Sequence, residues 1–226
     1  MNKPPRREIK SYIRRESRMS PALREALVRL WPKYGLSITD GLLAYQQVFH
    51  QPQKLILEIG FGMGQSLLQM AKATQDTCFI AVEVHRPGIA NLLVGLEKEQ
   101  LNNVRVYCED AILVLKQAIP DHSLNRTQVF FPDPWPKRRH HKRRLIQPSF
   151  LELLHQKLVP GGIFHAATDW QDYAVHIFQT LETSIKFTNV AQQKFATKPA
   201  YRPLTKFEER GYRLGHQSWD IIFKVK

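Results

Sequence analysis

The segment Lys54–Gly64 reads KLILEIGFGMG and joins a short apolar run to three closely spaced glycines. Apolar residues that follow one another with little alternation are typical of a parallel strand that is buried on both faces. Gly60, Gly62 and Gly64 allow a tight turn in which the backbone approaches a ligand closely. The segment therefore predicts a central strand, a ligand-binding loop and the start of a helix.

Outward from this segment, strands and helices alternate along the chain. The expected strands are 54–59, 78–83, 103–107, 127–131, 163–167, 185–190 and 218–223. The expected helices follow the glycine loop and cover 86–98, 111–117, 145–158 and 170–181, with a short helix at 21–30 and a linker at 31–53. This alternation predicts an α/β fold with a doubly wound, Rossmann-like sheet of seven strands, mixed but mostly parallel, with helices on both faces.

Composition narrows the class of protein further. The chain has 226 residues, of which 43% are apolar, and a formal net charge of +13. That length suits one domain over 21–226, preceded by a flexible basic arm over 1–20 that orders on RNA or serves only for solubility. The positive charge indicates a polyanionic partner, either nucleic acid or an anionic membrane surface. No apolar run reaches the roughly 18 residues of a membrane span, and Cys78 and Cys108 lack metal-ligand spacing, so we expect a cytoplasmic protein with no metal site.

Three carboxylates follow the first three expected strands. Glu83 ends the second strand, where it would accept hydrogen bonds from a ribose, and Asp110 follows the third, where it would accept from an adenine amino group. The glycine loop alone is shared by proteins that bind NAD and by those that bind S-adenosylmethionine. Glu58, placed near a methionyl amine, favours S-adenosylmethionine because a dinucleotide pyrophosphate would be repelled. The arrangement resembles a class I methyltransferase, although Glu83 or Asp110 alone is also explained as a helix-capping carboxylate.

A second informative stretch, Val129–Arg144, reads VFFPDPWPKRRHHKRR. Proline cannot continue the ladder of a central strand, so the apolar run ends there and Asp133 is held between two prolines at a strand end. Trp135 offers a flat face for stacking a base, and the basic octet that follows offers charge to phosphates. The alternatives are a simple turn at Asp133 and a solvated charged face after it.

Near the C-terminus, Arg202–His216 reads RPLTKFEERGYRLGH and interleaves basic with aromatic residues. This pattern favours a substrate-binding segment of about 198–216 that folds as a loop over the target base, or else a charged hairpin that caps the sheet. The block and the run PDPWPKRRHHKRR resemble the signatures of the tRNA (guanine-N7-)-methyltransferase family. The resemblance extends from about Leu55 to the C-terminus.

The resemblance implies an activity and assigns roles to individual residues. The activity is transfer of a methyl group from S-adenosyl-L-methionine to N7 of guanine in the variable loop of tRNA. Asp133 is the implied catalytic residue, and the cofactor set, with the loop glycines added, is Glu58, Gly60, Gly62, Gly64, Glu83, Asp110 and Asp133. The implied substrate positions are Lys137, Asp169, Thr205, Lys206, Phe207 and Glu208. The implied RNA-contacting run is Arg139, His140, His141, Lys142, Arg143 and Arg144.

The chemistry is compatible with these residues. Guanine N7 carries an unprotonated lone pair, so the reaction needs positioning and electrostatic stabilisation more than a strong base. Asp133 or Asp169 would accept from the guanine N1–H and 2-amino group, and Asp169 is alternatively a helix N-cap. Two other functions remain open: a different RNA or DNA base methyltransferase, such as an amino-group enzyme with a D-P-P-[YFW] motif, and a non-catalytic basic RNA-binding module. A homo-oligomer is left open.

Overall fold

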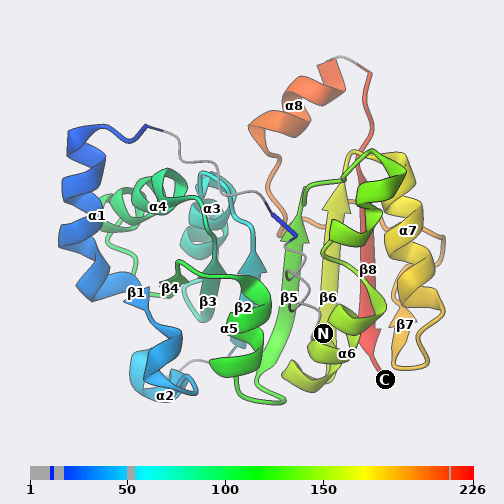
Figure 1. Cartoon of the computed structure of the whole chain (residues 1–226), viewed down its shortest axis with the longest axis horizontal. Helices are drawn as coiled ribbons and strands as arrows, with labels where there is room; N and C mark the ends of the chain where they lie inside the picture. Colours follow the sequence, from blue (N-terminus) through cyan, green and yellow to red (C-terminus); the bar gives the residue numbers. More distant parts are fainter. Residues whose placement is uncertain (1–10, 13–17, 50–53, 214) are drawn as a thin grey trace, which may run out of the picture.

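The computed structural model describes residues 11–12, 18–49, 54–213 and 215–226, which form one eight-stranded sheet with helices around it (Figure 1). Most of the predicted arm, 1–10 and 13–17, lies outside the described residues. The strands are β1 (Gly35–Leu36), β2 (Lys54–Ile59), β3 (Thr77–Val82), β4 (Val104–Tyr107), β5 (Leu124–Phe130), β6 (Leu158–Thr168), β7 (Phe187–Asn189) and β8 (Trp219–Val225). The helices are α1 (Pro21–Tyr34), α2 (Tyr45–Val48), α3 (Gln65–Ala73), α4 (Arg86–Lys98), α5 (Ala111–Gln117), α6 (Pro148–Lys157), α7 (Gln171–Glu182) and α8 (Lys206–Arg213), with short 3₁₀ turns η1 (Ile38–Asp40) and η2 (Arg138–Arg143).

The sheet confirms the predicted Rossmann-like fold. Its strand order is β1-β4-β3-β2-β5-β6-β8-β7, and β8 runs antiparallel to β6 and β7 while the other pairs are parallel. The strand order reverses between β2 and β5. In open α/β sheets a ligand binds in the crevice beyond the strand ends at such a switch point.

One strand was not predicted. The sequence indicated seven strands and a linker over 31–53, but Gly35 and Leu36 pair with Val106 and Tyr107 to add β1 at the sheet edge. A two-residue strand is too short to show any hydrophobic period, so only the tertiary pairing reveals it. Likewise α1 continues to Tyr34, past the expected end at 30, although Pro32 lies inside it.

Two apolar cores lie against opposite faces of the sheet. Alternate residues of β2 divide between them, because successive side chains on a strand point to opposite faces. Leu57 packs in the core that includes buried residues of α5, α6 and α7, whereas Ile56 packs in the core that includes those of α1, α3 and α4. Beyond the carboxyl ends of β5 and β6 stands α8, drawn in orange in Figure 1, where the sequence suggested a loop or hairpin.

Candidate active site

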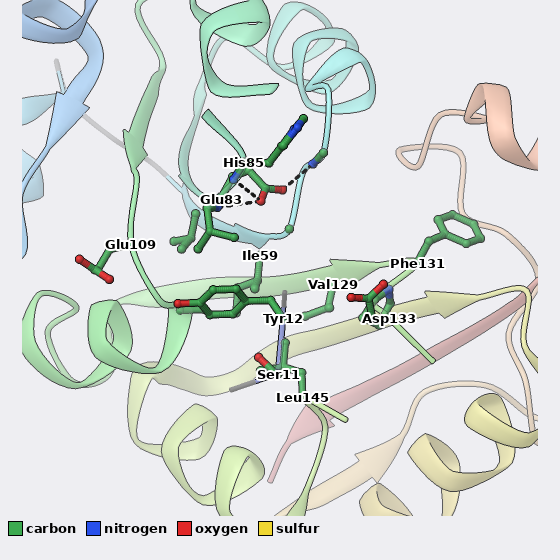
Figure 2. Close-up of a pocket in the computed structure, with 16 residues that line it drawn as sticks. Ser11, Tyr12, Ile59, Glu83, His85, Glu109, Val129, Phe131, Asp133 and Leu145 are labelled. Atoms are coloured by element: carbon green, nitrogen blue, oxygen red, sulfur yellow. Dashed lines mark hydrogen bonds between the residues drawn. The ribbon is translucent and has the colours of Figure 1, made fainter. Parts of the chain in front are cut away.

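A cavity of about 720 Å³ opens at the switch point of the sheet. It is bordered by Gly60 and Gly62 after β2, by Glu83 after β3, by Glu109 after β4 and by Asp133 after β5 (Figure 2). This size falls in the range of pockets that bury a small organic ligand. The structure therefore brings the glycine loop, Glu83 and Asp133 together, as the sequence predicted.

The glycine loop leaves room for a ligand. Gly60 and Gly62 have φ angles of 77° and 58°, which only glycine adopts without strain. A Cβ at either position would meet no atom within 4 Å, so side chains there would extend into open space. On the other side of the loop, a Cβ at Gly88 of α4 would lie 1.9 Å from the Gly62 carbonyl oxygen. The loop is thus held closely by α4 while its exposed side stays free of side chains.

Glu83 ties this loop to the end of β3. Its carboxylate accepts hydrogen bonds from the backbone N–H groups of Gly62 at 2.9 Å, Val84 at 2.7 Å and His85 at 3.0 Å, as the dashed lines in Figure 2 mark. A carboxylate offers about four acceptor positions, so Glu83 retains capacity for a ligand hydroxyl. Its place on the cavity wall fits a ribose-binding role.

Glu58 and Asp110 are placed differently from Glu83. Neither borders the cavity. Glu58 is 2% exposed and accepts from the Gln128 side-chain amide at 2.8 Å, and burial raises the pKa of Glu58 to about 7. Asp110 caps α5 by accepting from the N–H of Ile112 at 2.8 Å, which is the capping alternative considered from the sequence. Both carboxylates are therefore bonded to parts of the fold behind the cavity wall and do not line the cavity.

Glu109 borders the cavity where the sequence led us to expect Asp110. Sequence reasoning missed this residue. The available signal was the adjacent pair Glu109-Asp110, in which a helix-capping role for one carboxylate leaves the other to face the ligand. Gly64, in contrast, lies inside the loop, and a Cβ there would meet Leu92 of α4 at 2.7 Å.

The backbone around Asp133 is unusual. Phe131 and Trp135 have φ angles of 52° and 47°, and bulky residues rarely adopt this left-handed conformation. Asp133, between them, is exposed and borders the cavity, and Figure 2 shows its carboxylate on the same cavity that Glu83 borders. Such outliers persist only when the surrounding structure holds them, and they cluster at functional sites.

Trp135 connects this loop to its neighbours. Its indole N–H donates to the Ser11 carbonyl at 3.2 Å, the Arg143 guanidinium lies 4.8 Å from its ring centroid, and His140 packs edge-on at 5.8 Å. The ring face expected to stack on a base is therefore in contact with Arg143. Ser11, one of the few described residues of the N-terminal segment, borders the cavity beside it.

The basic octet contains exposed residues, three half-buried residues (His140, His141 and Arg143) and one buried residue. Lys137, Arg138, Arg139 and Lys142 are exposed around η2. Arg144 is 3% exposed: its Nε donates to the Pro134 carbonyl at 2.9 Å, and its guanidinium forms an ion pair with Asp172 of α7. Arg144 therefore holds the Asp133 loop against α7, and its predicted contact with RNA does not agree with this burial.

The remaining predicted substrate positions lie above the same edge of the sheet. Asp169 is exposed after β6, and the N-cap of α7 is Trp170, so Asp169 does not cap that helix. Thr205 directly precedes α8 and Glu208 lies in its first turn, where it is only 4% exposed. The side chains of Lys206 and Phe207 lie outside the described part of the chain. Within the described residues, no group of three or more potential ligands is placed to hold a metal ion, and no helix is long and apolar enough to cross a membrane.

Solved structures of other proteins share this fold. The 16S rRNA methyltransferase KamB is 14% identical, with a TM-score of 0.60 over 80% of this chain and 92% of that one. The aminoglycoside resistance methyltransferase NpmB1 is 12% identical, with a TM-score of 0.53 over 84% and 94%. At such identities the likeness shows the fold alone. Together with the strand order of the sheet, it establishes a Rossmann-like α/β fold.

Sequence comparison identifies the family. A family model described as "Putative methyltransferase" matches residues 52–221. The tRNA (guanine-N(7)-)-methyltransferase of Alcanivorax borkumensis is 48% identical over 97% of this chain and 92% of that protein. The enzyme of the same name from Nitrosococcus oceani is 51% identical over 96% of this chain and 91% of that protein. The chain belongs to the tRNA (guanine-N(7)-)-methyltransferase family.

Proposed function

We propose that this protein transfers a methyl group from S-adenosyl-L-methionine to N7 of guanine in the variable loop of tRNA. One observation carries the proposal: a single cavity borders both the glycine loop held by Glu83 and the strained loop that presents Asp133. The Asp133 loop runs directly into the exposed basic residues of η2. Family membership supports the choice of tRNA and of guanine N7.

The donor set of the cavity fits the cofactor. Gly60 and Gly62 would allow its close approach, Glu83 would accept from the ribose hydroxyls, and Glu109 would face the nucleoside from β4. S-adenosyl-L-methionine supplies an electrophilic methyl group on a sulfonium when it is bound. Glu58 and Asp110 would act indirectly, through Gln128 and the start of α5 respectively.

Asp133 is the proposed catalytic residue. Guanine N7 needs no base to activate it, so the protein contributes alignment and a negative charge beside the base as it becomes positive. Asp133 would accept from the guanine N1–H and 2-amino group, which would orient N7 towards the methyl group. Asp169, exposed at the end of β6, would be a second acceptor for the same base.

The RNA would approach across the exposed part of the octet and the C-terminal segment of about 198–216. Lys137, Arg139, His140, Lys142 and Arg143 would face phosphates, and the net charge of +13 would steer the polyanion towards them. Thr205–Glu208 would form the substrate side of the site. A tRNA substrate would place the enzyme in the cytoplasm.

The alternatives are less well supported. A non-catalytic RNA-binding module has no use for an open cavity that glycines keep free of side chains. An amino-group methyltransferase would carry D-P-P-[YFW] where this chain has Asp133-Pro-Trp-Pro136. Family membership likewise favours N7.

The test is methylation of bulk tRNA with labelled cofactor, followed by nucleoside analysis. We expect 7-methylguanosine as the labelled product, with an initial rate about 100- to 1,000-fold lower from Asp133→Asn at equal enzyme concentration. Asp121→Asn, which changes an exposed carboxylate paired with Lys157, is the matched control and should retain activity. A labelled nucleoside other than 7-methylguanosine, or no product from the unmodified protein, would refute the proposal.

A further inference from the structure

A row of buried polar side chains crosses the half of the sheet that includes β5, β6 and β8. Glu58 pairs in register with Gln128 of β5, and Gln128 with His165 of β6, so the three side chains point to one face. None of them is more than 2% exposed. Arg126 Nε donates to the Gln128 side-chain oxygen at 3.0 Å. This face of β5 and β6 is therefore held by specific polar partners.

The row ends at Arg202, which is fully buried (0% exposed). Its Nε and Nη2 donate to the two carboxylate oxygens of Asp220 on β8, at 2.7 and 2.8 Å, and its Nη1 donates to Glu208 at 2.7 Å. His165 Nε2 bonds Asp220 at 2.7 Å, and the Tyr201 hydroxyl bonds His165 Nδ1 at 2.9 Å. Burial opposes ionisation of Asp220, yet the bonds from His165 and Arg202 keep its pKa below the usual value.

The Glu208 carboxylate is buried and accepts bonds from three groups of the protein. Besides Arg202, its carboxylate accepts from the backbone N–H of Thr205 at 3.0 Å and from the Ser218 hydroxyl at 3.2 Å. In return, Thr205 Oγ1 accepts from the Glu208 N–H at 3.1 Å, which makes a reciprocal helix cap at the start of α8. The side chain of Glu208 is 1% exposed. Because this side chain is buried, an RNA base could reach it only if the arrangement around α8 opened.

Helix α8 depends on this anchor. It has 8 residues, and an isolated helix of that length does not persist in water. The contacts of Arg202 with Glu208 and Asp220 join its first turn to β8. Since buried charges are tolerated only when they are paired, the three side chains must keep this one arrangement.

We propose that Arg202, Asp220 and Glu208 are positioning residues that hold the segment 205–213 where it receives the RNA, and that Glu208 acts through Arg202 and Thr205 without touching the guanine. The inference rests on the proposed function, which makes this segment the substrate side of the site. Weakening the anchor should raise the KM for tRNA more than it lowers kcat. Cofactor affinity should not change, because none of the described side chains of α8 borders the cavity.

Isosteric variants test the proposal with the smallest change in side-chain shape. Asp220→Asn and Glu208→Gln each weaken one side of the anchor, and Asp121→Asn is the surface control. We expect each of the two to raise the KM for tRNA about 10-fold, the equivalent of one charge-assisted hydrogen bond. The KM of the double variant should be no higher than that of the more impaired single variant, because the two side chains act as one unit. Affinity for S-adenosylhomocysteine should be unchanged, and amide hydrogen exchange in 205–213 should be faster.

The results that would contradict this proposal can be told apart from one another. Direct contact between Glu208 and RNA would give an impaired Glu208→Gln, a normal Asp220→Asn and multiplicative effects in the double variant. Normal KM values in both variants would overturn the proposal, because the network would then serve only to stabilise the fold. If the buried variants do not fold, Ser218→Ala removes two bonds that join Ser218 to α8, one to the Glu208 carboxylate and one to the Tyr212 hydroxyl. An unchanged KM in that variant would also overturn the proposal. If the unmodified protein makes no 7-methylguanosine, the proposed function fails, whereas hydrogen exchange in Asp220→Asn still tests the anchor by itself.

Discussion

The two halves of the sheet, on either side of β2, differ in what covers one face. In the first half, β3 and β4 pack against apolar side chains of α1, α3 and α4. In the second half, the same face of β5, β6 and β8 packs against the buried charges of Arg202 and Asp220. The first half builds its part of the site mainly from backbone, with a glycine loop and three N–H groups held by Glu83. The second half builds its part from buried side chains that form hydrogen bonds and ion pairs with one another.

The difference has a physical consequence. An apolar interface is held by non-directional contacts and tolerates substitutions of similar volume. A buried polar network instead loses the full desolvation energy of any group that is left without its partner. We therefore expect changes in the first half to affect cofactor binding alone, and changes in the second half to affect RNA binding and folding together.

Asp133 lies where the two halves meet, and its replacement should have the largest effect. Asp133→Asn keeps the size of the side chain and removes the charge beside the developing cation. Loss of one such preorganised group lowers kcat by about 100- to 1,000-fold. Single-turnover kinetics with saturating cofactor measure this directly, and cofactor affinity should fall much less. A rate close to that of the Asp121→Asn control would remove Asp133 from the chemistry.

Glu83 tests the half that is built from backbone. Glu83→Ala removes the acceptor for the ribose and releases the Gly62 N–H, and each charge-assisted bond contributes about 1.5–3 kcal/mol. Cofactor affinity measured by calorimetry should fall by roughly 10- to 150-fold. Binding of tRNA should be unaffected. Glu99→Ala, which removes a carboxylate paired with Lys72 elsewhere on the surface, is the control. Equal cofactor affinity in the two variants would contradict the assignment.

Glu58 begins the polar row and gives stability a pH dependence. Its pKa is raised from 4.5 to about 7, so the folded protein binds an extra proton between these values. The stability from that proton is complete below pH 4.5 and is lost as the pH rises through about 7. Glu58→Gln, which is always neutral, should reduce this loss by an amount on the order of 1–3 kcal/mol. The free energy of unfolding by denaturant, measured across this pH range, tests the expectation, with Glu97→Gln as the control. If wild type and Glu58→Gln give parallel curves of unfolding free energy against pH, Glu58 is not the titrating group.

Within the octet, the exposed residues Arg139 and Lys142 likewise differ from the buried Arg144. Arg139→Ala with Lys142→Ala removes two exposed charges and should flatten the slope of log affinity for tRNA against log salt by about 1.4–1.8 units. Arg144→Ala should leave the slope unchanged and lower thermal stability, because the Pro134 carbonyl and Asp172 lose their partner. A flatter slope in Arg144→Ala would show that Arg144 leaves its buried site to bind RNA.

Several elements were predictable because their signals are local. Strand β2 and helices α4 and α5 have the expected bounds, since a continuous apolar run or a helical period ends at glycine, proline or a capping carboxylate. The meeting of Gly60, Glu83 and Asp133 was also predictable, because all follow parallel strands and such strands end at one edge of the sheet.

Other features depended on residues distant in the chain. Arg144 and Arg202 carry the same charge as their exposed neighbours, so composition alone assigned them to the surface. The ion pair that buries Arg144 joins residues 28 positions apart, and the bond between His165 and Asp220 joins residues 55 positions apart. Helix α8 likewise has too few apolar residues to be predicted, and its first turn is joined to β8 through Glu208, Arg202 and Asp220.

The sequence by itself determined the α/β alternation, the family and the edge of the sheet at which the site lies, because hydrophobic period and strand-end residues are properties of short segments. Only the tertiary structure decided which charges are exposed and which are buried. That choice depends on pairing, since a buried guanidinium is stable only where folding brings carboxylates or carbonyls within hydrogen-bonding distance. Arg202, surrounded by Asp220 and Glu208, is buried for this reason, whereas Arg139 has no such place and remains exposed.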